Sequence, residues 1–137
     1  MHTTISFDGI NWLAVALATI LSFVLGALWH SPMLFGKAWK EDGNPKVDKA
    51  DKGRNMKIFG FSALFHFVAV VGLAVLIGHD STLLTGLYIG FLVSLAWVFT
   101  AIGVTYLFAG RTFRLLLIDA GFYVVYFSLA GLIIGAW

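Results

Sequence analysis

The chain has 137 residues, of which 60% are hydrophobic and 12% are charged, and its formal net charge is +2. A soluble domain is about 25% charged, so a chain this short lacks the polar residues to cover its surface in water. This composition excludes an ordinary soluble domain and favours an integral membrane protein. The small net charge gives no support for nucleic-acid binding. The chain has no cysteine, which excludes disulfides and thiolate metal sites.

Four apolar segments follow one another and predict a single membrane domain, residues 1–137. The first covers about residues 10–29, enough at about 1.5 Å per residue to cross a ~30 Å hydrocarbon core. We do not expect a cleaved signal peptide, because no Lys or Arg precedes this segment and no A-x-A-like site precedes a mature domain. The other three segments are about 58–78, 83–108 and 113–137. Their length and lack of sustained alternation predict helices rather than a membrane β-barrel.

The connections between these segments differ in length. Residues 79–82 and 109–112 form short turns, so the segments on either side of each turn are expected to be antiparallel neighbours. The connection at 30–57 is long, and residues 33–40 within it carry apolar side chains on one side of a helix. These are Leu34, Phe35, Ala38 and Trp39. We therefore predict an all-α membrane protein, a four-transmembrane-helix bundle with a short amphipathic interfacial helix between the first two spans.

The basic residues predict how the chain is oriented. All nine Lys and Arg residues lie in 30–57 or 110–114, whereas both chain ends and the turn at 79–82 have none. The positive-inside rule then places both termini outside and loops 30–57 and 109–112 in the cytoplasm. Four tryptophans fall at the two predicted membrane interfaces, as expected of an aromatic belt. These are Trp12 and Trp137 on the outer side, and Trp29 and Trp39 on the inner side.

Two interpretations of the long basic loop stay open. Clustered lysines beside a membrane attract anionic lipids, and Lys46, Lys49 and Lys52 are the candidates. Alternatively the lysines only set the topology, since acidic residues such as Glu41 and Asp42 dilute their charge.

Small residues at helical spacing predict where two spans meet. Gly86 and Gly90 form a GxxxG pair in the third segment, and Gly131 and Gly135 form another in the fourth. Such pairs allow backbones to approach closely in lipid. We expect these two spans to touch there, within one chain or across a dimer. The third span also presents a longer stripe of mostly small residues, namely Gly86, Gly90, Ser94, Trp97, Ala101 and Thr105.

Ionisable residues inside a membrane are costly, so each one needs a reason. Asp119 lies about six residues into the fourth span, roughly 9 Å below its cytoplasmic end. Its candidate partners are Arg114, Arg111 or a tyrosine hydroxyl. Four further polar side chains fall in the same half of the predicted bundle. These are His30, His66, Tyr106 and Tyr123.

A layer of histidine, aspartate and tyrosine has two interpretations. It can relay protons or bind a cation, because histidine titrates near neutral pH. It can also be a buried polar network that only fixes helix register. Two histidines and one carboxylate on separate helices carry no metal-binding signature. No GxSxG, HExxH, P-loop or Rossmann glycine pattern is present in the sequence.

These patterns favour a small proton- or ion-linked transporter or channel-like protein over an enzyme, with no metal or cofactor. Four spans are few for a solute pathway in one chain, so we expect a homo-oligomer, by default a two-fold dimer. The alternative is a non-catalytic structural or lipid-interacting protein that acts through oligomerisation and its basic loop.

A compact motif runs from Ile10 to Lys40. It consists of Asn11-Trp12, then Gly26, Trp29, His30, Ser31 and Pro32, then Phe35, Gly36 and Trp39. This motif resembles a family of small bacterial membrane proteins known as a domain of unknown function, DUF1761, in which Tyr is common at the position of His30. The resemblance implies a four-span protein of the bacterial inner membrane and assigns no activity, substrate or cofactor.

The motif also has a physical interpretation. Pro32 bars a straight continuation of the first helix, and Ser31 can cap the next one. Trp29 and Trp39 would lie at the membrane interface while Phe35 inserts. We predict an interfacial elbow built from Trp29, Ser31, Pro32, Phe35, Gly36 and Trp39.

Overall fold

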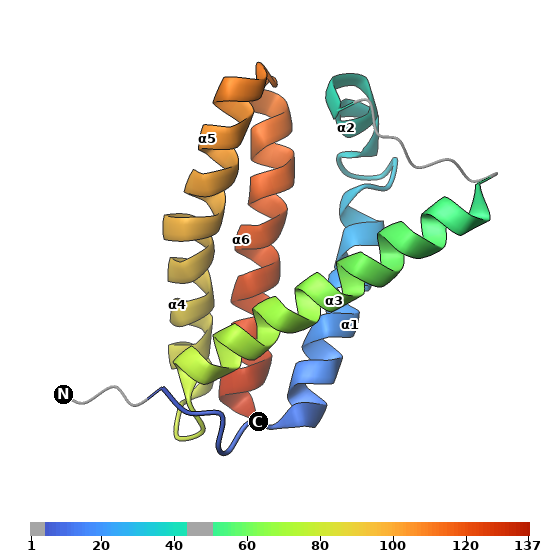
Figure 1. Cartoon of the computed structure of the whole chain (residues 1–137). Helices are drawn as coiled ribbons and strands as arrows, with labels where there is room; N and C mark the ends of the chain where they lie inside the picture. Colours follow the sequence, from blue (N-terminus) through green and yellow to red (C-terminus); the bar gives the residue numbers. More distant parts are fainter. Residues whose placement is uncertain (1–4, 44–50) are drawn as a thin grey trace.

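The structure is a computed structural model and describes residues 5–43 and 51–137. The described residues form helices and no strand, which confirms the all-α prediction (Figure 1). In chain order the elements are α1 (Trp12–Trp29), α2 (Gly36–Gly43), α3 (Lys52–Ile77), α4 (Leu83–Val93), the π-helical segment η1 (Ser94–Phe99), α5 (Thr100–Ala109) and α6 (Phe113–Ala136).

Four helices in the described part of the chain are long and apolar enough to cross a membrane, as expected of a multi-pass membrane protein. They are α1, α3, the continuous rod of α4, η1 and α5, and α6, with 18, 26, 27 and 24 residues. Their bounds differ little from the predicted segments, except that α3 begins at Lys52 rather than at residue 58. The reason is a side-chain cap, because Asp51 accepts the Arg54 N–H at 3.1 Å and extends the helix into its charged flank.

Side-chain caps also set the start of the other long helices. Asn11 accepts the N–H groups of Leu13 and Ala14 at the start of α1. A threonine, Thr82 or Thr112, accepts a backbone N–H in the first turn of α4 and α6. These residues satisfy backbone donors that have no partner inside the helix. The asparagine of the Asn-Trp motif is therefore a helix cap.

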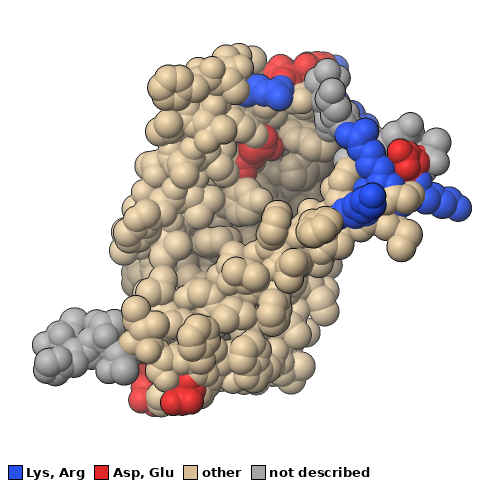
Figure 2. Space-filling model, viewed as in Figure 1, with Lys and Arg blue, Asp and Glu red and all other residues tan. Residues whose placement is uncertain are grey.

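The described residues before α1 and the C-terminus lie at one end of the bundle, and α2 and the turn between α5 and α6 lie at the other (Figure 1). On the face shown in Figure 2, the Lys and Arg atoms lie at or near the end that carries α2, this turn and the start of α3. The helix α3 crosses the others obliquely, and its first half diverges from them. All its buried residues lie in its last third, from Val70 onward.

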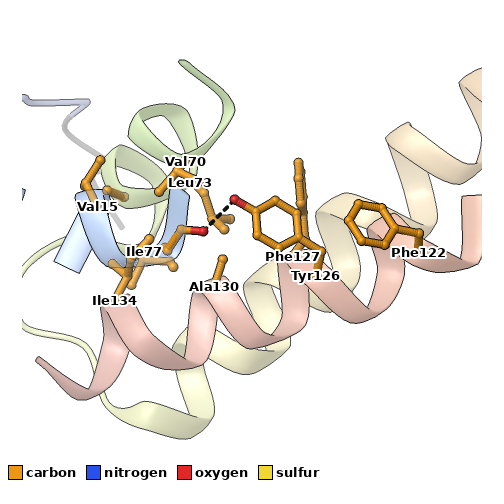
Figure 3. Packing of buried hydrophobic residues seen from close by; sticks show 11 residues of the cluster. Val15, Val70, Leu73, Ile77, Phe122, Tyr126, Phe127, Ala130 and Ile134 are labelled. Carbon is orange, nitrogen blue, oxygen red and sulfur yellow. Dashed lines mark hydrogen bonds between the residues drawn. The ribbon is translucent and has the colours of Figure 1, made fainter. Parts of the chain in front are cut away.

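The apolar core joins α1, α3 and α6 (Figure 3). Its buried residues are Val15, Ala18, Val70, Leu73, Ala74, Ile77, Phe122, Tyr126, Phe127, Ala130 and Ile134. Tyr126 is the largest side chain that is fully buried, and its hydroxyl donates a 2.8 Å hydrogen bond to the Ala18 carbonyl. This cluster packs the half of the bundle that is nearer to the termini.

The helices α4 and α6 lie backbone to backbone at their glycines. A Cβ atom on Gly86 would collide with the Gly131 carbonyl, and one on Gly131 would collide with the Gly86 carbonyl. A Cβ on Gly135 would meet the Gly86 backbone at 3.1 Å, and one on Gly90 would meet Ser128 Cα at 3.3 Å. The two GxxxG pairs therefore face each other within one chain.

The stripe predicted on the third span ends at Ser94. Gly86, Gly90 and Ser94 are buried, but Trp97 is 63% exposed and Ala101 and Thr105 are exposed as well. The prediction of one continuous face was wrong because residues 94–99 form a π-helical turn. Such a turn holds more residues than an α-helical one, so α5 is rotated relative to the face that α4 packs on α6.

Candidate functional site

An open pocket of about 540 Å³ lies at the basic end of the bundle. It is lined by His30, Trp39, Ala101, Ile102, Thr105, Tyr106, Asp119 and Tyr123. Figure 2 shows a hollow in this part of the molecule, and acidic atoms are visible inside it. Pockets that hold small ligands usually measure about 300–1,000 Å³, so this one is of a suitable size.

Four elements contribute to the pocket. Asp119 and Tyr123 are one helical turn apart on α6, and His30 follows the last residue of α1. Trp39 comes from α2, and α5 contributes Tyr106 beside its small residues. The π-helical turn permits this arrangement, since α4 packs its glycines on α6 while α5 turns a different face toward the same helix.

Asp119 is paired with a tyrosine. The Tyr106 hydroxyl donates a hydrogen bond to Oδ2 of Asp119. The other carboxylate oxygen of Asp119, Oδ1, lies 3.9 Å from Nε2 of His30. This distance is too long for a direct hydrogen bond. Of the partners expected for Asp119, a tyrosine hydroxyl is therefore the one found, and Arg114 is engaged elsewhere.

His30 is held so that one ring nitrogen points at this carboxylate. Its Nδ1 lies 2.9 Å from the Gly26 carbonyl oxygen, and a carbonyl only accepts, so Nδ1 carries a proton. The nitrogen that gains or loses a proton is then Nε2, which faces Asp119. The His30 ring also packs on Trp39, with ring centroids 4.6 Å apart. This geometry suits an imidazole whose charge responds to the charge of Asp119.

His66 is not among the residues that line the pocket. Its Nδ1 lies 2.7 Å from the Ser62 carbonyl, and its Nε2 is buried with no hydrogen-bond partner among the described residues. Its ring stacks on Tyr123, which lines the pocket, at a centroid distance of 6.1 Å. Of the five predicted residues, the structure thus brings four together and places His66 behind Tyr123.

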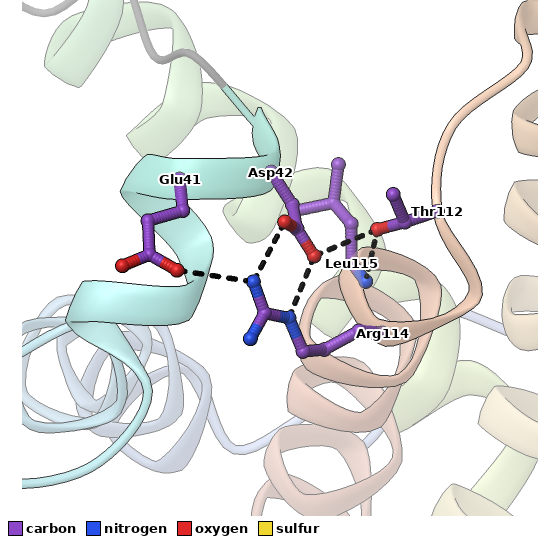
Figure 4. A network of polar contacts seen from close by, with 5 residues as sticks. All are labelled: Glu41, Asp42, Thr112, Arg114 and Leu115. Atoms are coloured by element: carbon purple, nitrogen blue, oxygen red, sulfur yellow. Dashed lines mark hydrogen bonds and ion pairs between the residues drawn. The ribbon is translucent and has the colours of Figure 1, made fainter.

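A polar clamp joins α2 to the start of α6 (Figure 4). The Arg114 guanidinium binds both oxygens of Asp42 at 2.7 Å and reaches Glu41 at 3.2 Å. Thr112 donates to Asp42 at 2.8 Å. The Arg114 guanidinium, and after it Thr112, lowers the pKa of Asp42 to about 2. We name Glu41, Asp42, Thr112 and Arg114 the α2 clamp, and it holds Trp39 in the pocket wall.

The α2 clamp was not predicted, because Glu41 and Asp42 were considered only as charges that dilute the basic loop. Their position offered a signal. Two adjacent carboxylates end the short helix between the first two spans, and an arginine begins the last span. In the predicted topology both lie at the same membrane face.

The elbow after α1 is tight, and it corrects two predictions. The Ser31 hydroxyl donates back to the Leu28 carbonyl at 2.6 Å and does not cap α2. The helix α2 begins at Gly36 rather than at residue 33, because residues 31–35 form turns in which Phe35 N–H binds the Trp29 carbonyl at 3.1 Å. Gly36 is required here, since a Cβ would collide with the backbone of the preceding turn.

Trp29 ties this elbow to α6. Its indole N–H donates a 2.9 Å hydrogen bond to the Ile118 carbonyl, and Phe35 packs on its ring at 4.8 Å. We expect Trp29→Phe to lower the free energy of unfolding by about 0.6 kcal/mol, the average for hydrogen bonds between membrane helices, and by at most about 1.7 kcal/mol. Thermal unfolding in detergent measures this change, with Trp97→Phe as the control. Equal stability of both variants would show that the hydrogen bond contributes nothing.

The structure describes one of the three lysines proposed to bind anionic lipid. Lys46 and Lys49 lie outside the described residues, and Lys52 is the first residue of α3.

The comparisons with known proteins agree with the motif. A family model described as "Protein of unknown function (DUF1761)" matches residues 13–135, which confirms the predicted resemblance over most of the chain. No match was found among curated proteins or among solved structures.

Proposed function

The chain belongs to the DUF1761 family, and we propose that it is a small proton- or cation-linked transporter whose site is the pocket around Asp119. The observation that carries the proposal is this pocket, which brings His30, Tyr106 and Asp119 together and opens to the outside of the fold. Ionisable residues inside membrane spans commonly mark ion paths and proton relays. A purely structural network would instead be expected to be packed without an open cavity.

The pocket lies in the half of the bundle that carries α2 and the basic residues, and Figure 2 shows the hollow on a lateral face of the molecule. The half nearer the termini is closed by the core around Tyr126 and Phe127. A continuous pore would not have a closed half, which supports a carrier over an open channel.

The proposed setting follows from charge. The described Lys and Arg residues lie in α2, at the start of α3 and around the turn between α5 and α6. By the positive-inside rule this end faces the cytoplasm of a bacterial inner membrane, with both termini outside. The site would then lie in the cytoplasmic half of the membrane domain. A homo-oligomer, by default a dimer, completes the proposal because one chain provides only four spans.

Asp119→Asn tests the site. We expect the variant to fold and to lose the proton-linked flux of the native protein, because an amide cannot carry the negative charge. The flux is measured in proteoliposomes loaded with a pH-sensitive dye after a pH step, with helix content and elution volume as checks on folding. The matched control is Asp80→Asn, since Asp80 is 93% exposed in the turn before α4.

Two results would overturn this proposal. One is a native protein that moves no protons or cations under any imposed gradient. The other is an Asp119→Asn variant with native flux. If the substitution instead unfolds the chain, Tyr106→Phe provides the second variant, because it removes the hydrogen bond to Asp119 and keeps the ring.

A further inference from the structure

The pocket combines one carboxylate with three aromatic rings, and each ring comes from a different element. Trp39 lies on α2, Tyr106 on α5 and Tyr123 on α6. No Lys or Arg is among the lining residues. We propose that this pocket binds the ammonium group of a small organic cation, with Asp119 as its counter-charge and the three rings as its wall. This inference rests on the proposed function and names its class of substrate.

Asp119 has free capacity to bind a cation. One carboxylate oxygen accepts a hydrogen bond from the Tyr106 hydroxyl, and the other lies 3.9 Å from Nε2 of His30. The side chain of Asp119 is 20% exposed and lines the pocket. Tyr106 fixes the carboxylate in place, and Oδ1 can accept a hydrogen bond from an ammonium donor. Charge-assisted hydrogen bonds of this kind are about twice as strong as neutral ones.

The aromatic wall also favours an ammonium group. The faces of tryptophan and tyrosine rings attract cations, and aromatic cages recognise ammonium groups. Trp39 is half-buried, its ring packs on His30 at a centroid distance of 4.6 Å, and the α2 clamp joins its helix to α6. Tyr123 is likewise half-buried, and its ring packs against Phe122 at a centroid distance of 5.2 Å. Two of the rings are thus supported from behind and do not need to move to meet a ligand.

The size of the pocket and its few ligand groups favour an organic cation over a bare ion. A water molecule occupies about 30 Å³ in the liquid, so a pocket of about 540 Å³ is far larger than a bare ion needs. The described residues contain no group of three or more His, Asp or Glu residues that could hold a metal ion. An organic cation with several heavy atoms fills such a pocket, and Ala101 and Ile102 provide an apolar surface for its carbon atoms.

The positive charges nearest to the pocket are largely engaged. Arg114 is bound by Asp42 and Glu41 in the α2 clamp. The Arg111 guanidinium lies 3.4 Å from the Gly43 carbonyl oxygen. His30 repels a cation only when it is protonated. Asp119 raises the pKa of His30, so a protonated His30 and a bound cation would compete for this carboxylate.

Two sources supply an ammonium group, and the experiment separates them. Ethanolamine represents a free amine, and phosphatidylethanolamine represents a lipid headgroup. We expect protonated ethanolamine to bind the purified chain by calorimetry, whereas its neutral isostere propan-1-ol does not bind. Alternatively the chain retains phosphatidylethanolamine over phosphatidylglycerol in native mass spectrometry. Ethanolamine binding identifies a free amine as the source, and selective lipid retention identifies the headgroup.

Variants test the two parts of the pocket. Asp119→Asn is expected to weaken binding by about tenfold or more, and Trp39→Leu by several-fold. The control for the latter is Trp97→Leu, because Trp97 is 63% exposed on η1, away from the pocket. Equal binding of ethanolamine and its isostere, native binding by both pocket variants, or no binding from either source would overturn the inference. Binding is read without flux, so binding without transport would overturn only the proposed function, and flux without ammonium binding only this inference.

Discussion

Replacing Gly131 by leucine is expected to separate α4 from α6 and to destabilise the fold. Gly131 is buried, and even one added carbon would collide with the Gly86 carbonyl. The obstacle is backbone, so no side chain can rotate away, and the two helices must separate. Overpacking in protein cores costs about 1–3 kcal/mol and occasionally more. We expect Gly131→Leu to lower the free energy of unfolding by about 3 kcal/mol or more, because separating the helices also breaks the neighbouring glycine contacts.

The measurement is thermal unfolding of the purified chain in detergent, together with its elution as a single species. The control is Gly72→Leu, the same substitution at a helical glycine of α3. A Cβ atom added to Gly72 would meet no neighbouring atom within 4 Å. This variant is expected to keep native stability apart from a small gain from helix propensity. Similar unfolding temperatures for native protein and Gly131→Leu would show that α4 and α6 do not meet at these glycines.

Lowering the pH is expected to release α2 from α6. The α2 clamp keeps the pKa of Asp42 at about 2, below its ordinary value of 3.8. A lowered pKa means that the folded contact favours the carboxylate. The stabilisation is therefore complete above about pH 4 and is lost as the pH falls through about 2. Once Asp42 is protonated, Arg114 loses its bidentate partner and Trp39 leaves the pocket wall.

Spin labels report this release directly. The chain has no cysteine, so Lys40→Cys on α2 and Phe113→Cys on α6 form a unique labelled pair. We expect one short distance from pH 7 to about pH 4 and a broad distribution near pH 2. With Asp42→Asn added, the distribution is expected to be broad at every pH, while added Asp80→Asn leaves the native behaviour. A narrow distribution at pH 7 in the Asp42→Asn background would mean that other contacts hold α2.

The partner of Asp119 depends on which face of the third span packs against α6. A stripe of small residues was predicted along the whole third span, but the π-helical turn at 94–99 redirects its second half. That redirection places Tyr106 against Asp119 and makes it the carboxylate's partner. Arg114, the nearer candidate in sequence, turns instead to Asp42 on α2. Spacing on one helix therefore indicated the polar residues but not their pairs.

The sequence by itself determined that four apolar helices form this protein, where they begin and end to within a few residues apart from the earlier start of α3, and that the basic residues gather in two connections. These features depend on hydrophobic length, local caps and charge along the chain, which a linear pattern records. Only the tertiary structure decided that His30, Tyr106, Tyr123 and Asp119 share one pocket while His66 lies behind it. That outcome depends on the rotation of α5 and on the contact of α2 with α6. Both arise from packing between segments far apart in the chain.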